Sequence, residues 1–105
     1  MTYSKIDAAL KTVLPDATFH LSAPPGHDRY IIWAETGSHS QYADGVKTAT
    51  AYQASVYVYT QNEDDNLLNE VCEALDLADI PYDDPVPGYD DELQTMGTIL
   101  ECEVI

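Results

Sequence analysis

The chain has 105 residues, of which 19 are acidic and four are basic, so its formal net charge at neutral pH is −15. A surface this negative repels phosphate backbones, so the composition excludes ordinary binding to nucleic acid or to anionic membranes. Hydrophobic residues make up 45% of the chain, which is too many for a disordered acidic tail. We expect one domain, residues 1–105, with a core that needs no disulfide or metal.

The charge is unevenly distributed along the chain. Residues 1–52 carry five acids and all the cations, which gives this half a net charge of −1. Residues 53–105 carry fourteen acids and no Lys or Arg, which gives a net charge of −14. Such a surface can serve solubility, meet cations or basic partners, mimic a polyanion, or let a polyanion pass without binding it. The four cations are Lys5, Lys11, Arg29 and Lys47.

No residue pattern in the chain predicts catalysis, a cofactor or a metal centre. His20, His27 and His39 lack the spacing of metal ligands, and Cys72 and Cys102 lack any C-x-x-C or Cys/His pairing. Both cysteines fall at apolar positions of the expected elements, so we predict two buried thiols. The acidic runs lack calcium-loop spacing, so we expect them to attract counterions diffusely. The first twenty residues predict neither a signal peptide nor a membrane span, which makes the cytosol the default compartment.

Four elements are expected in the first half of the chain. Ser4 and an apolar stripe predict a helix over residues 4–14, which Pro15 ends. Residues 18–22 alternate as a short strand. Residues 29–36 form a continuous apolar run, which predicts a central strand covered on both faces. Residues 37–50 are small and polar, which leaves either a long mobile loop or the tip of a long hairpin.

The second half supplies a clearer pattern. Residues 51–60 alternate as a strand, and residues 62–77 have an acidic first turn and an apolar stripe typical of a helix. A proline-broken segment holding Tyr82 and Tyr89 can add an edge strand. Residues 98–105 alternate as the last strand, with Glu101 and Glu103 outward. The order α-β-β-β-α-(β)-β predicts an α+β fold. It has one antiparallel or mixed sheet of four to five strands, with two helices packed on one face.

Four segments together suggest a family. They are YIIWAE at 30–35, YQASVYVYT at 52–60 before an acidic-started helix, IPY at 80–82 after that helix, and YDDELQTMG at 89–97. This order resembles the small tail-completion proteins of long-tailed bacteriophages, the tail terminator and head–tail joining group. Related proteins often carry a His soon after the last segment, whereas this chain has Thr98 and Ile99 there.

The resemblance implies a structural protein without enzymatic activity. It implies a homo-oligomeric ring, commonly six-fold, that caps the tail tube, docks it to head-connector proteins and forms part of the virion tail. Before assembly the protein would be in the host cytoplasm. An acidic lumen would let DNA pass, and the chain would bind neither a specific nucleic-acid sequence nor a membrane. Both a terminator and a connector-side joining protein fit these features.

Residues are assigned to these surfaces from charge and exposure, because no motif marks them. Tyrosine supplies a large contact area with little rotamer entropy, although it is also a good strand former. The predicted subunit or tube interface consists of Arg29, Gly37, His39, Tyr42, Gly45, Lys47, Tyr57 and Tyr59. The predicted acidic lumen or partner face consists of Asp64, Asp65, Asp83, Asp84, Asp90, Asp91 and Glu92.

Two other functions remain open from the sequence. An acidic mimic of DNA could inhibit a DNA-processing enzyme, and a net charge of −15 suits that class. Against it, the acids lie in short runs and proline-broken loops rather than at regular intervals. A small adaptor with one acidic partner-binding face also fits.

Overall fold

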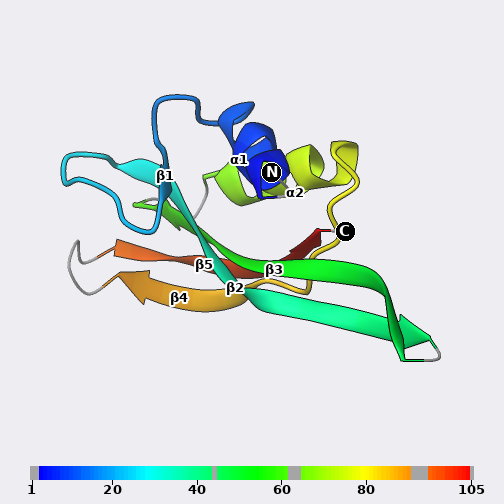
Figure 1. Cartoon of the computed structure of the whole chain (residues 1–105). Coiled ribbons are helices and arrows are strands. Elements are labelled where there is room, and N and C mark those ends of the chain that lie inside the picture. Colours follow the sequence, from blue (N-terminus) through cyan, green and yellow to red (C-terminus); the bar gives the residue numbers. More distant parts are fainter. Residues whose placement is uncertain (1–2, 44, 62–64, 91–94, 105) are drawn as a thin grey trace.

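The computed structural model describes residues 3–43, 45–61, 65–90 and 95–104, with the backbone alone for 38–43, 47–50, 89–90 and 95–96. The described residues form two helices and five strands in an α+β arrangement, as the sequence predicts (Figure 1). In chain order they are α1 (Ser4–Lys11), β1 (Thr18–His20), β2 (Arg29–Ala43), β3 (Val46–Thr60), α2 (Leu67–Leu77), β4 (Val86–Asp90) and β5 (Thr95–Val104).

All five strands belong to one mixed sheet in the order β1-β2-β3-β5-β4. Strand β1 pairs parallel to β2, and the other three pairings are antiparallel. The two longest strands, β2 and β3, have 15 residues each and lie side by side through the middle of the sheet. Residues 81–83 continue the sheet beside β5, because the Asp83 N–H donates to the Glu101 carbonyl and the Glu103 N–H donates to the Pro81 carbonyl.

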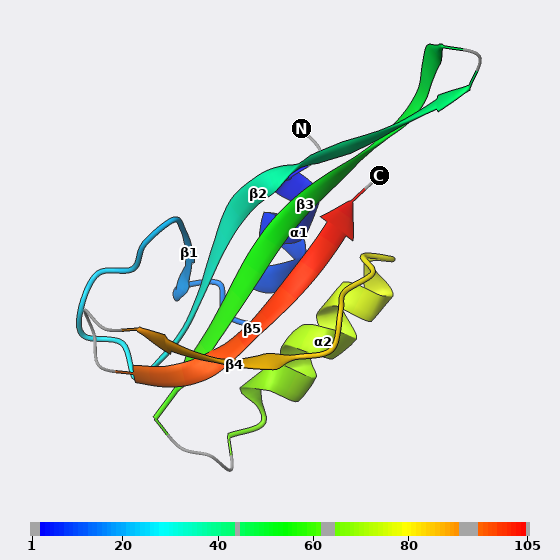
Figure 2. The same ribbon diagram turned by 90° about the horizontal axis from the view of Figure 1, so that it is seen from below.

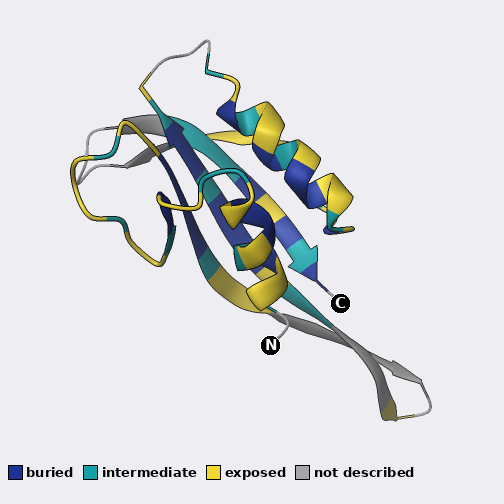
Figure 3. Ribbon diagram, turned by 90° about the horizontal axis from the view of Figure 1, so that it is seen from above, coloured by how far each residue is buried: buried dark blue, intermediate teal, exposed yellow. Residues whose placement is uncertain are grey.

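Both helices pack on the same face of the sheet, which we call the covered face (Figures 1 and 3). Their apolar stripes meet the inward residues of β2, β3 and β5 in one cluster of buried side chains. The apolar spacing in both helices therefore predicts this layer correctly. Its largest buried members are Ile6, Leu10, Ile31, Val56, Leu67, Val71, Leu75 and Leu100, which have no exposed surface, and Ile80, which has 2%.

Neither α1 nor α2 lies on the opposite face of the sheet, which we call the open face (Figure 2). A smaller aromatic cluster lies on it, where the rings of Tyr30 and Tyr59 stack with centroids 4.8 Å apart. Ile32 belongs to the same cluster, whereas Ile31 and Trp33 belong to the covered face. Strand β2 is thus buried on both faces over its first residues, as its continuous apolar run predicts.

Several element boundaries differ from the sequence prediction; strand β5, for example, begins at Thr95 rather than Thr98. Helix α1 ends at Lys11 rather than Leu14, and its cap residue is Tyr3 rather than Ser4. Strand β1 ends at His20, because Leu21 adopts φ +73° and turns the chain out of the sheet. Helix α2 begins at Leu67, whose N–H donates to Oδ1 of Asp65 at 2.9 Å. That side-chain acceptor fixes the start of the helix, and the apolar stripe alone did not locate it.

Strands β2 and β3 extend beyond the rest of the sheet as a two-stranded ribbon (Figure 2). Strand β5 reaches only as far as Tyr52, and β1 only as far as Trp33. We call residues 38–43 and 46–51 the arm; a register shift between Glu35 and Gly37 lies at its base. Of the two alternatives for residues 37–50, the long hairpin is correct.

Candidate functional site

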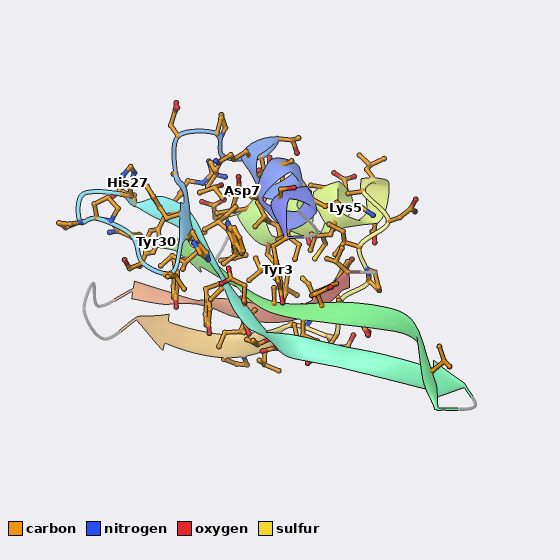
Figure 4. The ribbon with its side chains drawn as sticks, in the orientation of Figure 1. Tyr3, Lys5, Asp7, His27 and Tyr30 are labelled. Atoms are coloured by element: carbon orange, nitrogen blue, oxygen red, sulfur yellow. The ribbon has the colours of Figure 1, made fainter. Side chains whose placement is uncertain are left out.

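The base of the arm is held by the N-terminal helix. Tyr3, the cap of α1, lies between that helix and the β2–β3 ladder (Figure 4). Its hydroxyl is 2.9 Å from the carbonyl oxygen of Gly37 and 3.2 Å from that of Gln53, two residues that pair across the ladder. The ring of Tyr3 also packs edge-on against Tyr52, with centroids 5.6 Å apart. These contacts fix the direction in which the arm leaves the body.

A polar network continues from Tyr3 along the same edge. Tyr3 stacks on Trp33, whose indole N–H donates to Oδ1 of Asp7 at 3.0 Å. Lys11 pairs with the other oxygen of Asp7 at 2.8 Å. Partial burial alone would raise the pKa of Asp7, but the hydrogen bonds from Lys11 and Trp33 outweigh it and lower that pKa. His20 also stacks on Trp33, and its Nε2 contacts Oε1 of Glu35.

The open face has an apolar and an acidic end. In the register of the sheet, Tyr57, Ile99 and Val86 form one row across β3, β5 and β4. Tyr57 and Ile99 are half-buried, and Val86 is 50% exposed. Two residues further along β5 lies Glu101, which accepts a hydrogen bond from the hydroxyl of Ser55 at 2.7 Å. The face therefore changes from apolar to acidic over a short distance.

A hollow of about 270 Å³ lies at the acidic end, beside the base of the arm. Its walls carry three carboxylates and no Lys or Arg. Burial, followed by the charge of Glu101, raises the pKa of the Cys102 thiol to about 12, so this wall residue stays protonated and is a poor nucleophile at neutral pH. The lining residues are Gln53, Pro81, Tyr82, Asp83, Glu101, Cys102 and Glu103.

The cysteines are both free thiols. Cys102 is buried, as predicted, whereas Cys72 is only half-buried because it lies at the rim of the α2 stripe rather than at its centre. The hydrogen bond with Cys72, together with partial burial, raises the pKa of the Tyr82 hydroxyl to about 12. Among the described residues, no group of three or more His, Cys, Asp or Glu is arranged to hold a metal ion.

The predicted interface residues separate into two groups at opposite ends of the β2–β3 ladder. Gly37 lies at the base of the arm, and Gly45 lies exposed at its tip with φ +77°. The backbones of His39, Tyr42 and Lys47 lie in the arm. Arg29, Tyr57 and Tyr59 lie toward the other end, because Arg29 pairs with Thr60 in the ladder.

The second group is largely engaged within its own chain. The Arg29 guanidinium pairs with Oδ2 of Asp65 at 2.7 Å and lies 3.6 Å from Oε2 of Glu70. Tyr59 is only 6% exposed, since it stacks between Tyr30 and Tyr57. Of Tyr57 and Tyr59, Tyr57 keeps more surface on the open face.

The predicted acidic face is only partly assembled by the described residues. Asp83 and Asp84 are exposed, Asp90 lies in β4, and Asp65 is occupied by Arg29 and the start of α2. Asp64, Asp91 and Glu92 lie outside the described residues. The sequence assignment omitted Glu101 and Glu103, although their outward positions in the alternating last strand indicated exposure.

No helix in the described ranges is long and apolar enough to cross a membrane.

No protein-family model matches this sequence, and no curated protein matches it. Among solved structures, the chain is similar to one from the virion of a native gene transfer agent (GTA) particle. That similarity covers 98% of this chain and 89% of the other, with a TM-score of 0.62 and 12% sequence identity. At this identity the similarity establishes a shared fold.

Proposed function

We propose that this chain is a structural virion protein that forms a ring on the end of a phage tail tube and joins the tube to the head. The ring would have an acidic lumen through which DNA passes. The observation that carries the proposal is the similarity to a chain of a gene transfer agent virion over nearly the full length of both chains. It agrees with the resemblance of the sequence to tail-completion proteins.

The charge of the chain supports the acidic lumen. Exposed carboxylates lie on the open face and on the outer side of α2, where Glu70, Glu73 and Asp76 are all exposed. A wall of this kind repels phosphates, so DNA would move past it without binding. A heterologous ring also needs two different complementary patches on each subunit, and the arm and the acidic body differ in this way.

Repulsion between subunits sets a condition on assembly. Six copies at −15 each would carry 90 negative charges, and their unscreened repulsion opposes ring closure. Screening by salt shortens the range of that repulsion to about 10 Å at 0.1 M ionic strength. Ring formation is therefore favoured by added salt or magnesium and weakened at low ionic strength.

The test is the molar mass by light scattering after size exclusion, over rising protein concentration, at low salt and with magnesium. A monomer that converts to a discrete species near six subunits supports the proposal. Where the chain alone stays monomeric, purified tail tubes are added as a template, and electron microscopy checks for a cap at the tube end. A chain that neither forms rings nor caps tubes would refute it, and competition by DNA for a basic enzyme would then favour the mimic.

A further inference from the structure

We propose that the tip of the arm docks into the acidic hollow on the open face of a second copy of this chain. In this contact Lys47 of the arm pairs with the carboxylates of Asp83, Glu101 and Glu103. This inference rests on the proposed function, since it names the surfaces that join neighbouring subunits in the ring.

The arm has the features of a docking element. In the described part of the chain, its two strands pair with each other and with no further strand. An isolated two-stranded ribbon is marginally stable in water, so a partner surface would stabilise it. Its tip presents Val46, whose side chain is 65% exposed, next to the cation Lys47.

The receiving surface has the complementary charge, beside an apolar row. Val86, 50% exposed, and Ile99 provide an apolar row on the open face. Glu101, two residues beyond Ile99 in β5, begins the acidic hollow. The cation of the arm therefore matches the carboxylates of the hollow.

The charge of the chain favours the arm over other segments as the occupant. Residues 38–51, which are the two strands of the arm and the two residues that connect them, contain one acid and one cation, Asp44 and Lys47. This segment is therefore neutral, while the rest of the chain carries the whole −15. A neutral, cation-bearing segment can approach the acidic body of another copy with little repulsion, whereas two bodies repel each other.

The geometry requires a second copy. Gln53 lines the hollow and pairs with Gly37 at the base of the arm, so the hollow lies where the arm leaves its own body. The ribbon then extends for residues 38–43, a length of about 20 Å at the usual rise of a β-strand. The tip of one arm is thus carried away from its own hollow, and the resulting contact is head-to-tail.

Zero-length cross-linking of amines to carboxylates tests the contact directly. Assembled protein, mixed from equal parts of ¹⁴N- and ¹⁵N-labelled chains, is treated with a carbodiimide and digested for mass spectrometry. We expect Lys47 to be joined to Asp83, Glu101 or Glu103 in peptides that combine the two isotopes. Links from Lys47 only to other carboxylates, or only within one chain, would overturn the proposal.

Charge exchange provides an independent test. Lys47→Glu is expected to weaken assembly about tenfold or more, and Glu103→Lys is expected to weaken it as well. The double variant, which restores opposite charges, should recover assembly. The matched control is Lys5→Glu, which makes the same change in net charge at an exposed position on α1. Circular dichroism confirms that each variant is folded.

The outcomes separate this inference from the proposed function. If the unmodified chain forms rings and Lys47→Glu behaves like Lys5→Glu, the docking proposal is wrong and the ring remains. If the unmodified chain neither forms rings nor caps tail tubes, both proposals fail together. Rescue by the double variant supports the arm-to-hollow contact specifically, because general repulsion changes only with total charge.

Discussion

The two faces of the sheet differ in how far other parts of the same chain cover them. The covered face is closed within the chain, by α1 and α2 over a cluster of residues that are almost wholly buried. On the open face, the described residues supply a small aromatic cluster, a half-exposed apolar row and an acidic hollow. The first face accounts for the stability of the fold, and the second has the composition of a contact surface.

This difference distinguishes apolar side chains that are buried from apolar side chains that are exposed, which the composition alone cannot do. Leu75 and Val86 are both apolar, yet one has no exposed surface and the other is half exposed. Substitutions on the covered face should change the free energy of unfolding, and those on the open face should change association. Four experiments test this division, beginning with the largest expected effect.

Leu75→Ala should lower the free energy of unfolding by about 2–5 kcal/mol, because it leaves a cavity in the covered cluster. Val86→Ala removes an apolar group that is already half exposed to water. It should change the free energy of unfolding by about 0.5 kcal/mol or less. Urea unfolding of both variants measures the contrast. Equal costs at the two positions would show that the open face is a second core and not a contact surface.

Gly97→Ala should cost about 1–3 kcal/mol, because part of the open face is tightly packed. A Cβ at this position would lie 2.6 Å from Cδ1 of Tyr59 and still closer to the carbonyl oxygen of Val58. The matched control is Gly88→Ala, where the obstacle is the flexible side chain of Ile99. In thermal unfolding, the midpoint temperature of Gly97→Ala should lie well below that of Gly88→Ala. The reverse order would contradict the close packing.

Tyr3→Phe should cost about 0.5–1.5 kcal/mol, since it removes the hydroxyl that bonds at the base of the arm. The loss should be local, with faster hydrogen exchange at the amides near Gly37 and Gln53 than in α2. Exchange measured by mass spectrometry gives the regional pattern. A uniform change across the chain would mean that Tyr3 supports the whole fold and not the arm in particular.

Asp7→Asn should have the smallest effect, about 1 kcal/mol or less at neutral pH, because the carboxylate is partly exposed. Folding lowers the pKa of Asp7 below its ordinary value of 3.8, so the ionised group stabilises the fold above that value. The stabilisation is lost as the pH falls through the folded pKa. Urea unfolding should therefore show the two proteins converging in acid; a difference that persists there would rule out the charge as its source.

Periodicity predicted the covered face well, because a helix stripe and an alternating strand each show their buried positions locally. It could not resolve residues 37–50, where small polar residues form strands only because β2 and β3 continue the ladder begun in the body. Nor could it show that Tyr59 is buried, since the neighbour that covers it, Tyr30, is far away in the sequence.

The candidate site depended even more on distant pairings. Glu101 and Glu103 were expected to point outward, but only the return of residues 81–83 beside β5 makes a hollow with Asp83. The pairing of Arg29 with Asp65 likewise joins residues 36 positions apart. The charges along the sequence therefore predict that the surface is acidic, whereas the shape of that surface depends on the order in which the strands pair.

The exposed edges of the arm have a consequence for unassembled protein. Unpaired strand edges template aggregation, and this ribbon lacks the prolines and the row of charges that usually block such edges. The large negative charge of the body protects it instead, by keeping free copies apart in dilute salt. For the proposed ring, the colloidal stability of the subunit and its competence to assemble would therefore be opposed, because the ionic strength that permits the ring would also permit fibrillar association.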